Sequence, residues 1–190
     1  MKQFNINTGS NETYVVFHGT GGNEYSLLQF VGDINKEANY RAYIGEVGTG
    51  AERRFNLPLQ NGQLNREDFN ARVDEFLAQW ATEIPAGKIT FLGYSNGANF
   101  IVGLLERNPS IADQVILLKP TNLGFTFEDG SAAKIIITAG ARDTQSIPGE
   151  TVKLAKQLQE QFPNTVYKLF DHGHGINDEE ITTVARMLHE

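Results

Sequence analysis

Residues 88–100 read KITFLGYSNGANF, and this stretch decides the fold. A run rich in apolar and β-branched residues ends in Gly93-Tyr94-Ser95-Asn96-Gly97, and an apolar helical pattern begins directly behind it. A strand, a sharp turn with a central serine and a helix in immediate succession are typical of a nucleophile elbow, where flanking glycines relieve backbone crowding. We therefore predict that Ser95 is a nucleophile at the carboxyl end of a strand. The alternative is an ordinary turn whose glycines serve only packing.

The rest of the chain repeats this alternation of short apolar runs with helical patterns, which is typical of βα units around a mainly parallel sheet. The predicted strands are Tyr14–His18, Arg41–Gly45, Lys88–Tyr94, Val115–Lys119, Lys134–Ala139 and Thr165–Phe170. Several are apolar at every position, as in strands that helices cover on both faces. We expect one α/β domain over residues 1–190, with a sheet of about six to seven strands.

Four segments carry the 3.6-residue apolar spacing of amphipathic helices. Their apolar stripes are Phe69, Val73, Phe76, Leu77 and Trp80; Ile101, Val102, Leu104 and Leu105; Val152, Ala155, Leu158 and Phe162; and Ile181, Val184, Ala185 and Leu188. Asn65 is the predicted N-cap of the first helix, and Asn177 with Glu180 is a predicted capping box before the last.

Residues 46–64 form the longest stretch without clear periodicity. Because irregular segments of this length often border binding sites, we expect this loop to form the rim of one. It contains Arg53 and Arg54, which favour an anionic group on the substrate. The alternative is that both arginines are solvated surface side chains.

Composition excludes several classes of function. The chain has no cysteine, which rules out thiolate nucleophiles and thiolate metal ligands. Its 16 basic and 23 acidic residues give a net charge of −7, and no cluster of Lys and Arg is dense enough to follow a phosphate backbone. No apolar run approaches the roughly 20 residues of a membrane span, and residues 1–10 lack the pattern of a signal peptide. We expect a cytoplasmic protein without nucleic-acid or membrane partners.

A serine nucleophile needs a histidine that takes its proton. His189 lies next to the C-terminus and His18 ends a predicted strand, which leaves His172 and His174 in the loop behind the last strand. Loops at the carboxyl ends of strands build the sites of open α/β sheets. We favour His174, because it lies between two glycines, whereas His172 is closer to the strand. A metal site made of Asp171 and these two histidines is the alternative, but no further ligand cluster completes it, so we predict no metal.

The predicted triad also needs an acid that orients the histidine. Asp143 follows the strand Lys134–Ala139 and so lies at the same edge of the sheet. Asp171 is the rival, although a loop aspartate beside glycine is usually only a turn former. The chain order Ser95, Asp143, His174 is that of the α/β-hydrolase arrangement and differs from the two other convergent orders of serine proteases.

The segment HGTGGNE, residues 18–24, follows the first predicted long strand and supplies a second set of backbone donors. Glycines let the backbone approach a substrate closely, so we predict that the amides of Thr20 and Asn96 form an oxyanion hole. Gly19, Gly21 and Tyr94, their neighbours in sequence, are the predicted substrate-binding residues. A phosphate-binding loop is the weaker alternative, because the segment matches neither common glycine-rich pattern.

Together these segments resemble the phospholipase/carboxylesterase family of small bacterial α/β-hydrolases over most of the chain. The likeness rests on residues 18–24, on FLGYSNGAN at 91–99, on ITAGARD at 137–143, and on Gly173-His174 with Glu179-Glu180-Ile181 behind it. The resemblance implies an α/β-hydrolase fold and hydrolysis of carboxylic esters through a triad of Ser95, Asp143 and His174, without a cofactor. It also implies oxyanion donors at Thr20 and Asn96.

Three positions depart from the family pattern and leave the substrate open. Asn23 replaces a common aspartate, Lys119-Pro120-Thr121 replaces a His-Pro-Met type of segment, and Gly175 follows the histidine where a larger residue is common.

We expect a serine carboxylesterase that hydrolyses small or short-acyl esters through an acyl-enzyme on Ser95. No insertion between Val115 and Gly149 is long enough for a lid domain, so the site should be open. A thioesterase or lysophospholipase with the same triad, and a catalytically silent binding protein of this fold, stay open as alternatives. The expected partner is a small-molecule ester, and a homodimer is also left open.

Overall fold

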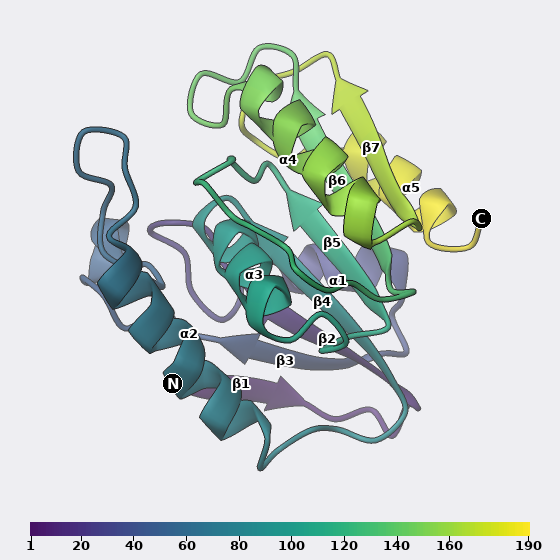
Figure 1. Ribbon diagram of the computed structural model, residues 1–190. Helices are drawn as coiled ribbons and strands as arrows, with labels where there is room; N and C mark the ends of the chain where they lie inside the picture. The colour runs from purple at the N-terminus through teal and green to yellow at the C-terminus, as the bar shows by residue number, and fades with distance from the viewer.

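The computed structural model describes residues 1–190 (Figure 1). Its strands are β1 (Gln3–Ile6), β2 (Glu12–Phe17), β3 (Asn39–Tyr43), β4 (Lys88–Tyr94), β5 (Gln114–Leu118), β6 (Lys134–Gly140) and β7 (Thr165–Phe170). Its helices are α1 (Leu28–Ile34), α2 (Arg66–Trp80), α3 (Asn96–Arg107), α4 (Pro148–Gln161) and α5 (Asp178–Met187), with a 3-10 turn, η1, at Gly50–Glu52.

The seven strands form one sheet in the order β1-β3-β2-β4-β5-β6-β7. Only β1 runs antiparallel to its neighbour, and the other strand pairs are parallel. This mostly parallel sheet with helices confirms the predicted α/β-hydrolase fold class. Because β2, β4, β6 and β7 point the same way, the loops that follow them meet at one edge of the sheet.

Helices cover both faces of the sheet, with α2, α3 and α4 on one side and α1 and α5 on the other (Figure 1). The side chains of β2 alternate between the two layers: Val15 and Phe17 pack in the core under α2 and α3, and Tyr14 and Val16 pack on the α1 side. This two-sided burial explains why several of the strands are apolar almost throughout, as predicted.

Two elements carry too little signal to be predicted. β1 is a four-residue edge strand whose alternating pattern is half polar, and α1 has no side-chain cap and contains Gly32. Several predicted strands also end too late, because His18, Gly45 and Lys119 lie outside the sheet. In α4, Leu154 is buried against the sheet, whereas Val152 is only partly buried.

The predicted N-caps are present, but the capping box is only half formed. Asn65 Oδ1 accepts a hydrogen bond from Asp68 N at 3.1 Å, and Asn177 Oδ1 accepts one from Glu180 N at 2.9 Å. The carboxylate of Glu180 does not accept a hydrogen bond from the backbone N–H of Asn177, because it pairs with Lys119 in the interior instead. The prediction that Glu180 completes a capping box was therefore wrong.

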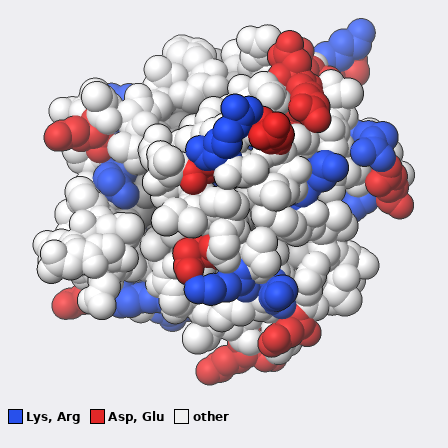
Figure 2. Space-filling view, turned by 90° about the horizontal axis from the view of Figure 1, so that it is seen from above, with Lys and Arg blue, Asp and Glu red and all other residues white.

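Figure 2 shows basic and acidic side chains interspersed on the face seen from above, over a mostly uncharged surface. That face carries no continuous stretch of one sign. None of the helices combines the length and the apolar character that crossing a bilayer requires.

Candidate active site

Ser95 occupies a strained turn between β4 and α3. Its backbone has φ 52° and ψ −112°, a conformation that non-glycine residues rarely adopt, and its N–H donates to Leu118 O at 2.8 Å. A Cβ atom at Gly97 would lie 2.1 Å from Phe17 O, and one at Gly93 would lie 2.7 Å from Ala98 Cα. Side chains at either glycine would collide with backbone, so this turn has the geometry of a nucleophile elbow.

The structure brings the three predicted triad residues into one hydrogen-bonded chain. His174 Nε2 lies 2.9 Å from Ser95 Oγ, and His174 Nδ1 lies 2.7 Å from Asp143 Oδ2. Ser95 and His174 are partly buried, whereas the side chain of Asp143 is fully buried. A carboxylate on Nδ1 fixes the proton there and leaves the Nε2 lone pair facing the serine hydroxyl, which is the arrangement a general base requires.

The loop after β6 holds Asp143 by backbone donors. Asp143 Oδ1 accepts hydrogen bonds from Gln145 N at 2.8 Å and Ser146 N at 2.9 Å, so only Oδ2 is left for His174. The rival acid, Asp171, is almost fully exposed and pairs with Arg142 at 3.3 Å on the surface. The geometry therefore excludes Asp171 as the partner of His174.

The two candidate histidines have different surroundings. The ring of His172 stacks on Phe170 with 5.6 Å between ring centroids, and its Nε2 lies 3.3 Å from Glu180 Oε2, away from Ser95. No group of three or more His, Asp or Glu side chains is arranged to hold a metal ion. His172 therefore belongs to the packing behind the site.

Tyr94 lies differently from our expectation. Its hydroxyl donates to His174 O at 3.0 Å and its ring packs 5.3 Å from the imidazole, so it holds the histidine loop and does not line the cleft. Burial, with the nearby charges of Asp143 and Glu180, raises the pKa of Tyr94 to about 12. The phenol consequently keeps its proton and acts as a donor at neutral pH.

Two residues that line the cleft have backbone N–H groups without a hydrogen-bond acceptor inside the protein. Asn96 is the first residue of α3, and the first N–H groups of a helix have no intrahelical acceptor. The N–H of Thr20, in the loop after β2, makes no hydrogen bond to the protein, and both residues line the cleft beside Ser95. These are the two predicted oxyanion donors. The side chain of Asn96 is occupied, since it accepts from Phe55 N and donates to Asn56 Oδ1.

Gly19 and Gly21 flank Thr20 and shape its loop. A Cβ at Gly19 would lie 2.7 Å from the Tyr94 ring, and Gly21 has φ +80° and donates to Arg53 O at 2.8 Å. Neither lines the cleft itself. Both glycines therefore set the path of the loop, and Thr20 is the residue that reaches the cleft.

His18 supports the same loop, a role that the sequence pattern did not reveal. It is buried against Phe55, its Nε2 accepts from Gly45 N at 3.0 Å, and its Nδ1 lies 2.7 Å from Gly19 O. Burial lowers the pKa of His18, so the ring is neutral with its proton on Nδ1. This side chain joins the loop after β2 to the end of β3.

Ser95 opens into a cleft of about 370 Å³. The lining residues are Thr20, Arg54, Asn56, Pro58, Leu59, Ser95, Asn96, Asn99, Thr121, Leu123, Gln145 and Ser146. The loop 46–64 thus forms one wall, as predicted, through Arg54, Asn56, Pro58 and Leu59. Arg53 is not part of the lining.

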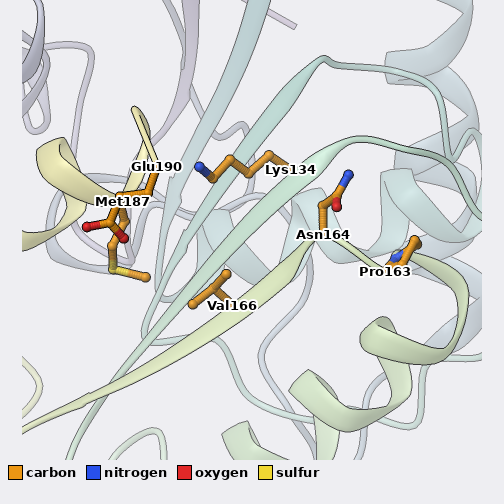
Figure 3. Close-up of a pocket in the computed structure, with 6 residues that line it drawn as sticks. All are labelled: Lys134, Pro163, Asn164, Val166, Met187 and Glu190. Carbon is orange, nitrogen blue, oxygen red and sulfur yellow. The ribbon is translucent and has the colours of Figure 1, made fainter.

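A second hollow, of about 540 Å³, lies at the opposite end of the sheet (Figure 3). Lys134, Asn164 and Val166 stand where β6 and β7 begin, and Met187 and Glu190 close it from the C-terminal end of the chain. The hollow contains no nucleophile beside a base. Ser95, His174 and Asp143 all lie at the other, carboxyl edge of the sheet.

A buried ion pair lies behind the histidine loop. Lys119 Nζ donates to both carboxylate oxygens of Glu180 at 2.5 Å, and both side chains are completely buried. The pair joins the end of β5 to the first turn of α5, the helix that begins four residues after His174. Lys119, noted above as a departure from the family pattern, therefore has an anchoring role.

No family model matches the chain. In sequence it is similar to MhqD of Bacillus subtilis, which bears the name of a hydrolase, with 28% identity over 178 residues that cover 90% of this chain and 89% of that protein. In structure it is similar to the Bacillus cereus carboxylesterase, with a TM-score of 0.84, 26% identity, and 98% and 92% of the two chains covered. A carboxylesterase from Mesorhizobium loti has a TM-score of 0.85 and 24% identity, with 97% and 92% covered.

These similarities bear out the resemblance that the sequence motifs indicated. The chain is a hydrolase with the α/β-hydrolase fold, and its relatives place it among hydrolases of the ester type.

Proposed function

We propose that this hydrolase is a serine carboxylesterase in which Ser95 is the nucleophile, His174 the general base and Asp143 the residue that orients it. The observation that carries the proposal is the continuous chain of hydrogen bonds from Ser95 Oγ through His174 to Asp143 Oδ2. It lies at the carboxyl edge of the sheet, beside a cleft large enough for a small ester.

The first half of the reaction forms an acyl-enzyme. Ser95 Oγ attacks the ester carbonyl while His174 Nε2 takes the hydroxyl proton, and the carbonyl oxygen becomes negatively charged. The free N–H groups of Thr20 and Asn96 stabilise that oxygen, and each such donor typically lowers the barrier by about 3 kcal/mol. His174 then passes its proton to the leaving alcohol as the ester bond breaks.

The second half releases the acid. A water molecule gives a proton to His174 Nε2 and attacks the acyl-enzyme, and Ser95 regains its proton when the tetrahedral intermediate collapses. Protons and electrons balance within these residues and water, so the reaction needs neither a metal nor an organic cofactor.

The small cleft favours short or slender esters over long acyl chains, because few apolar side chains line it. Thioesters and lysophospholipids would react through the same atoms, and the cleft contains nothing that rejects a thiol leaving group. Our second candidate is therefore a thioesterase, which a substrate panel separates from an esterase.

The test combines a fluorophosphonate probe with p-nitrophenyl butyrate. The wild-type protein should be labelled on Ser95 and should hydrolyse the ester, and Ser95→Ala should abolish labelling and lower kcat by about 10⁴-fold or more. A matched control is Ser110→Ala, a serine outside the cleft, which should keep full activity. A wild-type protein that shows neither labelling nor turnover would be a binding protein, and the proposal would be wrong.

A further inference from the structure

The cleft beside Ser95 contains a single charged side chain. Among its lining residues there is no Asp or Glu, and Arg54 is the only Lys or Arg. The acid of the triad, Asp143, is buried beneath the surface and committed to His174 and two backbone amides. A ligand in this cleft therefore meets one positive charge and no negative charge at its walls.

Arg54 differs from every other arginine of the chain because its side chain has no hydrogen-bond or ion-pair partner. Its Nε is buried without a hydrogen-bond acceptor, and its guanidinium takes part in no ion pair. The other seven arginines each donate a hydrogen bond or pair with a carboxylate; these are Arg41, Arg53, Arg66, Arg72, Arg107, Arg142 and Arg186.

The main chain holds Arg54 in place although its side chain is free. Its N–H donates to Val47 O at 2.8 Å, and its carbonyl accepts from Val47 N at 3.0 Å. The next residue, Phe55, donates to the side chain of Asn96, which adjoins the nucleophile. The main chain that carries the Arg54 side chain is thus held by the residue next to Ser95.

A partly buried cation without a counter-charge is unfavourable, because it loses hydration and gains nothing in return. The same loss of hydration lowers the pKa of Arg54, although an arginine stays protonated at neutral pH. Such uncompensated groups are typical of binding and catalytic sites, where the ligand supplies the missing partner.

A second donor in the cleft is also free. Asn99 Oδ1 accepts from Thr121 N at 2.8 Å, which fixes the orientation of the amide, while its NH₂ group makes no hydrogen bond to the protein. Arg54 and Asn99 therefore both offer N–H donors to an acceptor-rich group in the cleft.

We propose that Arg54 binds a carboxylate of the substrate, so that the preferred substrates are esters that carry a carboxylate, such as monoesters of short dicarboxylic acids. This inference rests on the proposed function and specifies its substrate class. A guanidinium matches a carboxylate in charge and in geometry, since it donates two parallel hydrogen bonds to the two oxygens.

The experiment compares matched esters that differ only in a carboxylate. One arm uses mono-p-nitrophenyl glutarate against p-nitrophenyl butyrate, which places the carboxylate on the acyl side; the other uses the butyrate ester of 4-hydroxybenzoate against phenyl butyrate, which places it on the alcohol side. Enzyme-free rates are subtracted, because a carboxylate can assist its own ester's hydrolysis. Wild-type kcat/KM should favour the charged ester by tenfold or more in one arm, and that arm identifies the side that Arg54 contacts.

Arg54→Met should lower this preference ratio by about 10- to 100-fold, the effect of losing hydrogen bonds to a charged group. Arg53→Met is the matched control: it removes the same charge from the adjacent residue, whose side chain lies outside the cleft, and should leave the ratio unchanged. Arg54→Lys, which keeps the charge but not the paired donors, should retain part of the preference.

The wild-type enzyme alone gives an independent measurement if Arg54→Met does not fold. Its preference for the charged ester should decline as ionic strength rises, because salt screens the attraction. A wild-type enzyme that hydrolyses the neutral esters but shows no preference for the charged one in either arm, or an unchanged ratio in Arg54→Met, overturns the inference while leaving the esterase intact. Failure to hydrolyse any ester and to label Ser95 refutes the proposed function, and the inference with it.

Discussion

The backbone around Ser95 has no room for additional atoms, whereas the backbone around His174 does. A Cβ at Gly97 would lie 2.1 Å from a main-chain oxygen of β2, but one at Gly175 would meet nothing within 4 Å. A Cβ at Gly173 would have its nearest neighbour at 3.7 Å, an ordinary contact distance. Glycine is therefore required sterically beside Ser95 but not beside His174, although glycines flank both predicted catalytic residues.

The difference shows two ways of placing a reactive group. The position of Ser95 follows from steric exclusion, because β4, α3 and the end of β2 pack so closely that one path of the chain remains. The position of His174 depends on polar contacts from distant parts of the chain: Asp143 on the ring, the Tyr94 hydroxyl on the carbonyl, and the Lys119–Glu180 pair behind the loop. Substitutions should therefore affect the two regions differently.

The largest expected effect is that of Asp143→Asn on activity. The amides of Gln145 and Ser146 require an acceptor at the Oδ1 position, so the NH₂ group of the asparagine must face His174 Nδ1. The imidazole then carries its proton on Nε2 and cannot accept one from Ser95, and kcat should decline by about 10⁴-fold. Turnover of p-nitrophenyl butyrate measures this. Asp171→Asn is the control, and a comparable loss in that variant would contradict our assignment of the acid.

The buried pair should have the largest effect on stability. Lys119→Met leaves the Glu180 carboxylate without its partner in the interior, which should lower the free energy of unfolding by about 3–5 kcal/mol. Burial lowers the pKa of Lys119 and the carboxylate of Glu180 opposes that shift, so the charge of Lys119 depends on Glu180. Urea denaturation gives the free energy of unfolding.

The double variant Lys119→Met/Glu180→Leu is the control for that experiment. It removes both charges and should recover most of the lost stability, since apolar replacement of a buried pair is often neutral. A double variant as unstable as the single one would show that packing, and not charge, holds the histidine loop.

The paired substitutions Gly97→Ala and Gly175→Ala test the comparison directly. Gly97→Ala should cost about 1–3 kcal/mol or more, because backbone atoms of β2 cannot move away from the new methyl group. Gly175→Ala should change the unfolding free energy by less than about 0.5 kcal/mol. Thermal melting of both proteins side by side is sufficient, and equal effects would mean that the two segments are constrained alike.

The smallest effect should come from Tyr94→Phe, which removes only the hydroxyl that donates to His174 O. The loss of one hydrogen bond should cost about 0.5–1.5 kcal/mol, or a two- to tenfold decline in kcat/KM. Labelling by the fluorophosphonate probe should slow by a similar factor, because Ser95 depends on the same histidine. A loss beyond 100-fold would indicate that Tyr94 contacts the substrate after all.

Much of the fold was predictable because its signals are local. Six of the strands are short apolar runs, and four of the helices have clear apolar periods. The caps Asn65 and Asn177 precede two of those helices as expected. The elements that were missed, β1 and α1, are short and lie at the periphery, where packing against the rest of the sheet stabilises sequences with weak propensity of their own.

The sequence by itself determined the nucleophile elbow, the helix caps and the order of Ser95, Asp143 and His174 along the chain, since each depends on neighbouring residues or on which strand a loop follows. Only the tertiary structure decided the partner of Glu180, the support given by His18 and the exposure of Arg54 to the cleft. These depend on contacts between residues from 27 to 61 positions apart, or on the absence of such a contact. Contacts between side chains so far apart in the sequence depend on how the helices pack on the sheet, and no local sequence pattern predicts them.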